Sequence, residues 1–234
     1  MENLFSKKFT FLNIIPCTPG EEKRLATQAV DYVNRTGNDI VLYSLTLHPE
    51  GVPAMEKPRK LLESYRALKT ELAGTDVKLG ILLQAILGHW PRIDKNIEPW
   101  TRTVDANGRV VRFCPLDVNF QKYIFDVVAM CAAEKPAFIL GDDDIRSFSP
   151  YAECFCELHT ALFNSRSGMN FTPKEYRLAV KNAEPSDPVY KIFEQLRQEQ
   201  PYGVTALIRK AINSVDPAIP AGTCLPGWEV HSYT

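Results

Sequence analysis

Apolar runs alternate with amphipathic segments along most of the 234-residue chain. The apolar runs are rich in branched and aromatic residues, which favour strands. They predict five strands, over residues 9–15, 40–47, 77–87, 137–140 and 219–224. The segments between them carry apolar side chains at helical spacing, and they predict helices over residues 21–36, 58–73, 119–134, 154–166, 173–181 and 188–215. Nearly continuous apolar strands that alternate with helices indicate a parallel sheet, and therefore an α/β fold.

Polar and aromatic side chains gather directly after the predicted strands. They are His48 and Glu50, His89 and Trp90, Asp142, Asp143 and Asp144, and Trp228 and Glu229. A (β/α)8 TIM barrel builds its site in this way, at the carboxyl ends of its strands. The chain has no G-x-G-x-x-G after the first strand and no P-loop, which argues against a nucleotide-binding doubly wound sheet.

The number of strands is smaller than a closed barrel needs. We count about five strand–helix units where a TIM barrel has eight. We therefore expect residues 1–234 to form a single barrel domain that is incomplete, the N-terminal portion of a longer barrel. The alternative is a complete flavodoxin-like sheet of five strands. Residues 96–115 are expected to form a long loop, and loops of that length are often functional.

The charge balance restricts the partners. Lys and Arg number 27 and Asp and Glu number 28, so the formal net charge is −1 and the sequence pI is near 6.4. Nucleic acid and anionic membranes both require a basic face, so we expect neither as a partner. The apolar stretch at residues 9–16 follows two lysines but is too short for a signal sequence. We interpret it as a buried strand and expect a cytoplasmic protein.

The six cysteines are expected to be reduced, because a domain of this size does not need disulfides. Two of the cysteines and a nearby histidine, Cys154, Cys156 and His159, form a C-x-C-x-x-H run that could bind zinc. Cys114 or Cys17 could supply a fourth ligand. The spacing is not that of a standard zinc finger, so we expect no metal, with zinc or another divalent cation as the alternative.

Three adjacent carboxylates, Asp142, Asp143 and Asp144, follow the fourth predicted strand. Strand alternation points Asp142 and Asp144 to one side and Asp143 to the other. A carboxylate beside others has a raised pKa, which suits a general acid. The same cluster could hold Mg²⁺ or Ca²⁺. It could also cap a helix and pair with Arg146.

Aromatic side chains flank the proposed site mouth. Flat rings can stack on the apolar faces of a sugar while neighbouring polar groups bind its hydroxyls. The aromatic residues are Trp90, Trp100, Tyr151 and Trp228. The polar candidates for substrate binding are His48, Glu50, His89, Arg146 and Glu229. No G-x-S-x-G or H-E-x-x-H occurs, so two common hydrolase signatures are absent.

Several segments together carry a resemblance that covers nearly the whole chain. They are residues 45–51, 86–90, 112–117, 141–146 and 154–159. They resemble a bacterial family of glycoside-hydrolase-like proteins in the TIM-barrel glycosidase superfamily, near the β-galactosidase type. The resemblance implies an acid/base carboxylate at the end of strand four, where this chain has Asp142 to Asp144 instead of the usual Glu. It also implies a nucleophile at the end of strand seven, which this chain does not contain.

These observations favour a glycoside hydrolase, with Asp143 or Asp144 as acid/base and His48, His89 and Trp90 positioning the sugar. One alternative is a carbohydrate-binding barrel without catalysis. Another is a metal-dependent hydrolase that uses the Asp cluster or the Cys/His run. Exposed sheet edges recruit partner strands, so a homo-oligomer is also possible.

Overall fold

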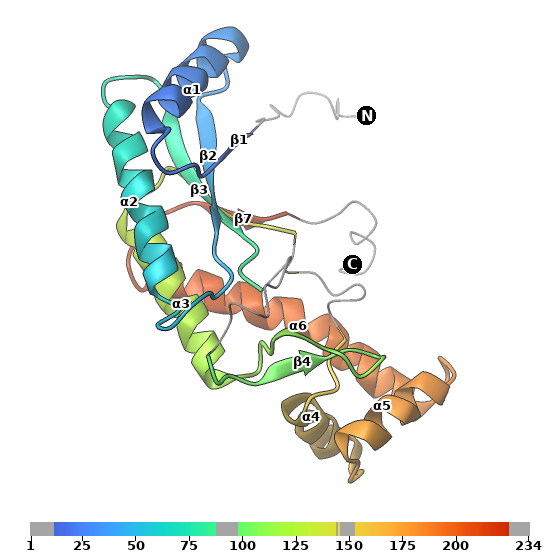
Figure 1. Cartoon of the computed structure of the whole chain (residues 1–234). Helices are drawn as coiled ribbons and strands as arrows, with labels where there is room; N and C mark the ends of the chain where they lie inside the picture. Colours follow the sequence, from blue (N-terminus) through green and yellow to red (C-terminus); the bar gives the residue numbers. More distant parts are fainter. Residues whose placement is uncertain (1–11, 88–97, 144, 146–152, 225–234) are drawn as a thin grey trace, which may run out of the picture.

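The computed structural model describes residues 12–87, 98–143, 145 and 153–224. Five parallel strands form its main sheet (Figure 1). These strands are β1 (Asn13–Pro16), β2 (Ile40–Thr46), β3 (Lys78–Gln84), β6 (Ile139–Gly141) and β7 (Ala221–Thr223). The predicted strands are therefore confirmed within the described residues, although most are shorter than their apolar runs. The part of the first predicted strand before residue 12 lies outside the described chain.

The strands lie in the sheet in the order in which they occur along the chain, β1-β2-β3-β6-β7. A flavodoxin-like sheet has a point at which this order reverses, and it carries helices on both faces. The sequential order therefore argues against the flavodoxin-like alternative. β1 and β7 are the two edges of the described sheet, which is open. The structure is an α/β fold with a parallel sheet, and it does not show a closed barrel.

The helices that follow the strands pack against one face of the sheet, and Figure 1 shows α1, α2 and α3 along that side. They are α1 (Glu22–Thr36), α2 (Glu56–Glu71), α3 (Val118–Ala133) and α6 (Pro188–Asn213). Capping residues determine where these helices begin and end. Gly37 ends α1 in the left-handed conformation. The Asp117 carboxylate caps α3 by accepting from the backbone N–H groups of Asn119 and Phe120.

Strand alternation separates the two faces of the sheet. Tyr43 and Leu45 of β2 belong to the apolar core under the helices. Ser44 and Thr46 have the opposite parity and therefore point to the other face. The polar strand-end side chains of that face lie at the carboxyl edge of the sheet.

The expected loop at residues 96–115 is partly wrong, because the structure contains a two-stranded hairpin there. Its strands are β4 (Arg102–Val104) and β5 (Val110–Phe113), which pair antiparallel. The turn forms because the Asp105 carboxylate accepts from the backbone N–H groups of Asn107 and Arg109. Strands of three and four residues leave too short a pattern to detect.

A small lobe of helices follows β6 in the chain. It contains α4 (Glu157–Ser167) and α5 (Pro173–Asn182) and has its own core. The core residues are Phe155, Phe163, Tyr176, Val180, Phe193 and Leu196. The last two belong to α6, which extends from this lobe to the main core at Val204 and Ile208. Among the described residues, no helix is both long and apolar enough to cross a membrane.

Candidate functional site

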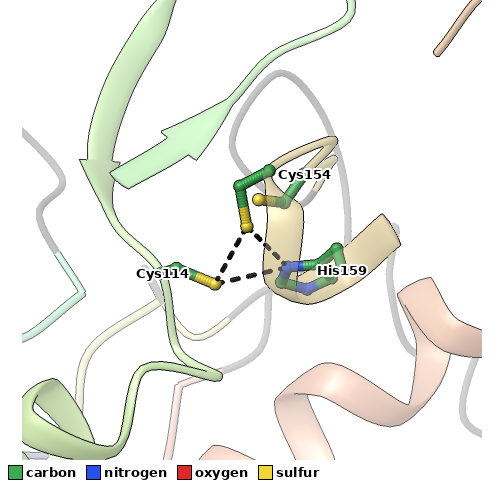
Figure 2. Close-up of side chains that lie close together, drawn as sticks. Cys114, Cys154 and His159 are labelled. Carbon is green, nitrogen blue, oxygen red and sulfur yellow. Dashed lines mark hydrogen bonds between the residues drawn. The ribbon is translucent and has the colours of Figure 1, made fainter. Parts of the chain in front are cut away.

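Three cysteines and one histidine meet between the hairpin and the small lobe (Figure 2). The ligand atoms of Cys114, Cys154, Cys156 and His159 all lie within 4.8 Å of one another. The Cys114 sulfur lies 3.3 Å from Nδ1 of His159. Cys156 Sγ lies 3.6 Å from both the Cys114 sulfur and the His159 nitrogen. All four side chains are buried.

These separations fit a tetrahedral zinc ion. A zinc–sulfur bond of about 2.3 Å gives a tetrahedron whose sulfur–sulfur edge is about 3.8 Å. The shorter zinc–nitrogen bond, about 2.0–2.1 Å, gives a slightly shorter sulfur–nitrogen edge. The observed 3.3 and 3.6 Å lie close to these edges. A disulfide requires sulfurs about 2.05 Å apart, and all six cysteines of the chain are free.

Backbone hydrogen bonds hold the ligands in place from both sides. Cys114 directly follows β5, and its N–H donates to the Thr101 carbonyl at 2.8 Å. Phe155 stands between the other two cysteines, and its N–H donates to the Val104 carbonyl at 2.8 Å. The N–H of Leu116 donates to the Cys114 sulfur at 3.4 Å. The hairpin and the start of α4 therefore bring together ligands that are far apart in sequence.

The electrostatics of this cluster favour a negative charge on one sulfur. Hydrogen bonds from Cys114 and Cys154 lower the pKa of Cys156, which stands at the N-cap of α4. A helix N-terminus also favours a thiolate. Burial acts to lower the pKa of His159, but its hydrogen bonds with Cys154 and Cys156 raise it to about 9. A thiolate close to three further soft or nitrogen donors is the chemistry that zinc selects.

The donor set defines what this centre can do. Three cysteines and one histidine complete the four positions of a tetrahedral zinc ion. Such a site has no open position for a water or a substrate, and the burial of its ligands excludes solvent. These four residues could therefore hold a structural metal ion. Of the two candidates for the fourth ligand, Cys114 is the one that lies beside Cys154, Cys156 and His159. Cys17 lies elsewhere, beside β2, with its N–H donating to the Ser44 carbonyl.

A second group of polar side chains lies at the carboxyl edge of the sheet. The hydroxyls of Ser44 and Thr46 donate to the same oxygen of the Gln84 side chain, at 3.0 and 3.1 Å. Asp142 continues this row, since its N–H donates to the Leu83 carbonyl at 3.3 Å. Two donors occupy the Gln84 oxygen, so its amide NH2 is the group that remains to contact a ligand.

Two further features mark this edge. Ala85 directly follows Gln84 and has φ 54°, a left-handed conformation that non-glycine residues rarely adopt. Such strain is concentrated at functional sites. Cys224 follows β7, and its N–H donates to the Gly141 carbonyl. Burial raises the pKa of Cys224, and the charges of Asp142 and Asp143 raise it further, so the thiol lies near both carboxylates.

The structure places His48 and Glu50 close together after β2. The side chain of Lys57 joins them, with Nζ 2.8 Å from Glu50 Oε2 and 3.2 Å from Nε2 of His48. The His48 side chain is buried. The two residues expected to bind substrate therefore form a compact cluster with Lys57, whose part in it the sequence pattern does not show.

Trp100 packs against a group of aromatic side chains. Its ring packs 4.8 Å from Phe113, 5.6 Å from Tyr123 and 5.9 Å from Phe120, between ring centroids. These neighbours belong to the main core, and Trp100 packs against it as a partly buried side chain. The other expected site residues lie outside the described residues. They are His89, Trp90, Asp144, Arg146, Tyr151, Trp228 and Glu229.

Sequence reasoning missed Ser44, Thr46 and Gln84 as candidates. A signal was present, because these polar residues occupy alternate positions near the ends of otherwise apolar strands. Polar side chains on a buried strand are costly unless they are hydrogen-bonded, so each such residue indicates a site or a network.

No protein-family model matches this chain, and no curated protein matches it. Solved structures share its fold, and two β-galactosidases are among them. The β-galactosidase of the psychrophilic Marinomonas ef1 matches with a TM-score of 0.63 and 16% sequence identity, over 92% of this chain and 37% of that enzyme. The β-galactosidase of Bacillus circulans sp. alkalophilus matches with a TM-score of 0.60 and 13% identity, over 94% of this chain and 37% of that enzyme. This chain thus has a fold similar to part of the β-galactosidases and spans about a third of their length.

Proposed function

We propose that this chain forms part of a glycoside-hydrolase-like barrel that binds a carbohydrate at the carboxyl edge of its sheet. The observation that carries this proposal is the row of Thr46, Gln84 and Asp142 along that edge. Their side chains offer a hydroxyl, an amide donor and a carboxylate, which are the groups that bind sugar hydroxyls. The shared fold with two β-galactosidases supports a galactoside as the first ligand to test.

Hydrolysis requires two carboxylates on opposite sides of the glycosidic bond. We propose Asp142 as one of them, because it continues the row formed by Thr46 and Gln84. The second would come from strands that close the barrel beyond the described sheet. A carbohydrate-binding barrel without catalysis uses the same Gln84 and Asp142 contacts, so an assay must measure binding and turnover separately.

The test uses the full-length chain. Calorimetry measures galactose and lactose binding, and release of nitrophenol from nitrophenyl β-D-galactopyranoside measures turnover. We expect Asp142→Asn to abolish turnover while the protein stays folded, and Gln84→Ala to weaken sugar binding about three- to tenfold. Gln28→Ala, on the exposed face of α1, is the matched control. An absence of sugar binding by the unmodified protein would refute the proposal.

We also propose a structural zinc ion at Cys114, Cys154, Cys156 and His159. The single observation that favours it is the agreement of their separations with a zinc tetrahedron. When bound, the ion would link the hairpin to the small lobe. Because its four protein ligands would fill the coordination sphere, this site does not favour the metal-dependent hydrolase alternative. Elemental analysis is expected to give one zinc per chain, and Cys114→Ser is expected to lose it. Chain purified without metal and still fully folded would contradict the assignment.

A further inference from the structure

A cavity of about 420 Å³ lies beside the cysteine and histidine cluster, between α6 and the helices α3 and α4 that contact it (Figure 1). This volume is within the range of small-molecule sites. The wall of the cavity is mainly apolar, and part of it is fully inside the fold, since Leu196 and Val204 are buried. Such a wall favours a ligand with an apolar body. The apolar side chains that line it include Leu116, Leu162, Leu196, Val204 and Leu207.

One buried polar side chain faces this cavity. His159 lines it and is only 7% exposed. Nδ1 of its ring lies 3.3 Å from the Cys114 sulfur and 3.6 Å from the Cys156 sulfur, and Figure 2 shows the ring turned toward the cysteines on that side. The opposite edge of the ring, which carries Nε2, therefore faces the cavity. Among the described residues, the hydrogen bonds of this ring are all with cysteine sulfurs.

The zinc ion proposed above determines where the proton of this ring lies, and the inference rests on that proposal. An imidazole that binds a metal through Nδ1 keeps its proton on Nε2. Metal-bound histidines almost always donate this N–H to a carboxylate, a carbonyl oxygen or water. A buried donor that lacks a partner is costly. The Nε2–H group of His159 therefore requires an acceptor, and a ligand in the cavity can supply one.

The charges around the cavity and the metal centre cancel. Arg166 and Glu199 both line the cavity and form an ion pair at 2.6 Å. Lys210 adds one positive charge to the lining. A zinc ion with three thiolate ligands carries one negative charge, and this centre lies directly behind His159. The two remaining charges are opposite, so the site as a whole favours neither an anion nor a cation, and burial penalises a charged ligand.

We propose that this cavity binds an uncharged, mainly apolar small molecule with one acceptor oxygen, such as an aromatic ketone. Its oxygen would accept a hydrogen bond from Nε2–H of His159, and the leucine side chains would enclose its apolar body. Gln121 offers a second contact to a larger ligand. Its NH2 group donates to the Pro115 carbonyl at 2.8 Å, which leaves its carbonyl oxygen to accept. The site uses none of the residues proposed to bind carbohydrate.

The first test is calorimetric titration of the zinc-loaded chain with acetophenone, after its zinc content has been measured. We expect saturable binding at one site per chain. Benzoate has a similar shape but carries a charge, so it should bind at least about tenfold more weakly. The absence of saturable acetophenone binding, or equally tight binding of benzoate, would overturn the proposal. A chain without zinc would refute the metal centre, whereas a zinc-loaded chain that does not bind acetophenone refutes only the cavity site.

Gly203 of α6 allows the cavity to be filled by mutation. It lines the cavity, and a Cβ atom at this position would meet no atom within 4 Å. Leucine is also a better helix former than glycine, so Gly203→Leu should fold. It should weaken acetophenone binding at least about tenfold. Gln198→Leu, at an exposed position of the same helix outside the cavity, is the matched control and should change the affinity by less than about twofold.

Two outcomes for Gly203→Leu would overturn the proposal. Unchanged acetophenone affinity would show that the ligand binds elsewhere. A dimer of the unmodified chain that Gly203→Leu dissociates, measured by light scattering, would show that a second copy covers the cavity.

Nuclear magnetic resonance of the imidazole nitrogens tests the hydrogen bond itself. The chain has four histidines, so the spectrum contains few signals. Acetophenone should shift the Nε2 signal of His159. Ethylbenzene is the control ligand, because it fills similar space without an acceptor, and its effect on this signal should be much smaller. An Nε2 signal that does not respond to bound acetophenone would overturn the role of His159.

Discussion

Removal of zinc from the Cys114, Cys154, Cys156 and His159 centre should destabilise the protein by a predictable amount. A ligand that binds only the folded chain stabilises it by RT ln(1 + [L]/Kd), which is about 4.1 kcal/mol when free zinc is a thousandfold above Kd. In a chain of about this length, 1 kcal/mol shifts Tm by roughly 2–4 °C. The chelated protein should therefore melt about 8–16 °C below the zinc-loaded protein.

The loss of stability on zinc removal should also be local. The metal would join residues 114 and 154–159, so its removal should loosen the hairpin and α4 before it affects the central strands β2 and β3. Differential scanning calorimetry with and without a chelator measures the Tm shift. Hydrogen exchange followed by mass spectrometry locates the affected segments. Cys224→Ser is the matched control, because this partly buried cysteine lies outside the cluster and should keep the full zinc-dependent shift.

One outcome would refute this reasoning directly. If chelation shifts Tm by less than about 2 °C and leaves exchange unchanged in α4, no bound metal contributes to stability. The buried thiols would then be ordinary core side chains held by hydrogen bonds to His159.

Three further predictions concern stability and assembly. Burial acts to raise the pKa of Asp117, but the backbone N–H groups of Thr101, Phe120 and Asn119 outweigh it and lower that pKa. The stabilising effect of the Asp117 carboxylate should therefore be complete above about pH 3.9 and be lost as the pH falls below that value. Acid denaturation of Asp117→Asn should lack this component, and an identical profile would count against it. Gly80→Ala should cost about 1–3 kcal/mol in urea unfolding, because its Cβ would lie 2.8 Å from the Phe138 carbonyl oxygen; a neutral effect would show that the sheet adjusts. The open edges β1 and β7 should make the isolated chain self-associate; light scattering that shows only monomer at high concentration would contradict this.

The parallel sheet could be predicted from sequence because its strands are nearly continuous apolar runs. β2 and β3 read as buried segments on both faces, and the short run at residues 137–140 was enough to indicate β6. Closure of the barrel could not be predicted in the same way, since periodicity reports burial and not the number of strands that meet. The open sheet agrees with the small strand count.

The proposed zinc ligands show where sequence reasoning stops. The C-x-C-x-x-H run offered three of the four, Cys154, Cys156 and His159, as an alternative to the expected absence of a metal, because those residues are close in sequence. Nothing in the spacing distinguishes Cys114 from Cys17 as the fourth. That choice depends on the hairpin, whose strands are too short to predict and which carries Cys114 directly after β5. Trp100 is a similar case, because a tryptophan pattern does not reveal whether the ring faces solvent or Phe113.

The order of elements along the chain has a consequence for biosynthesis. Strands β1, β2, β3 and β6 can pair as soon as the ribosome has released them, since each neighbour comes earlier in the chain. The last pairing, Ile139 with Ala221, must wait until the whole small lobe and α6 have been made. Because the segment between β6 and β7 is long, bringing the two strands together carries an entropic cost. A lobe that captures its metal during synthesis would shorten the free segment, so zinc supply would govern how quickly the fifth strand joins the sheet.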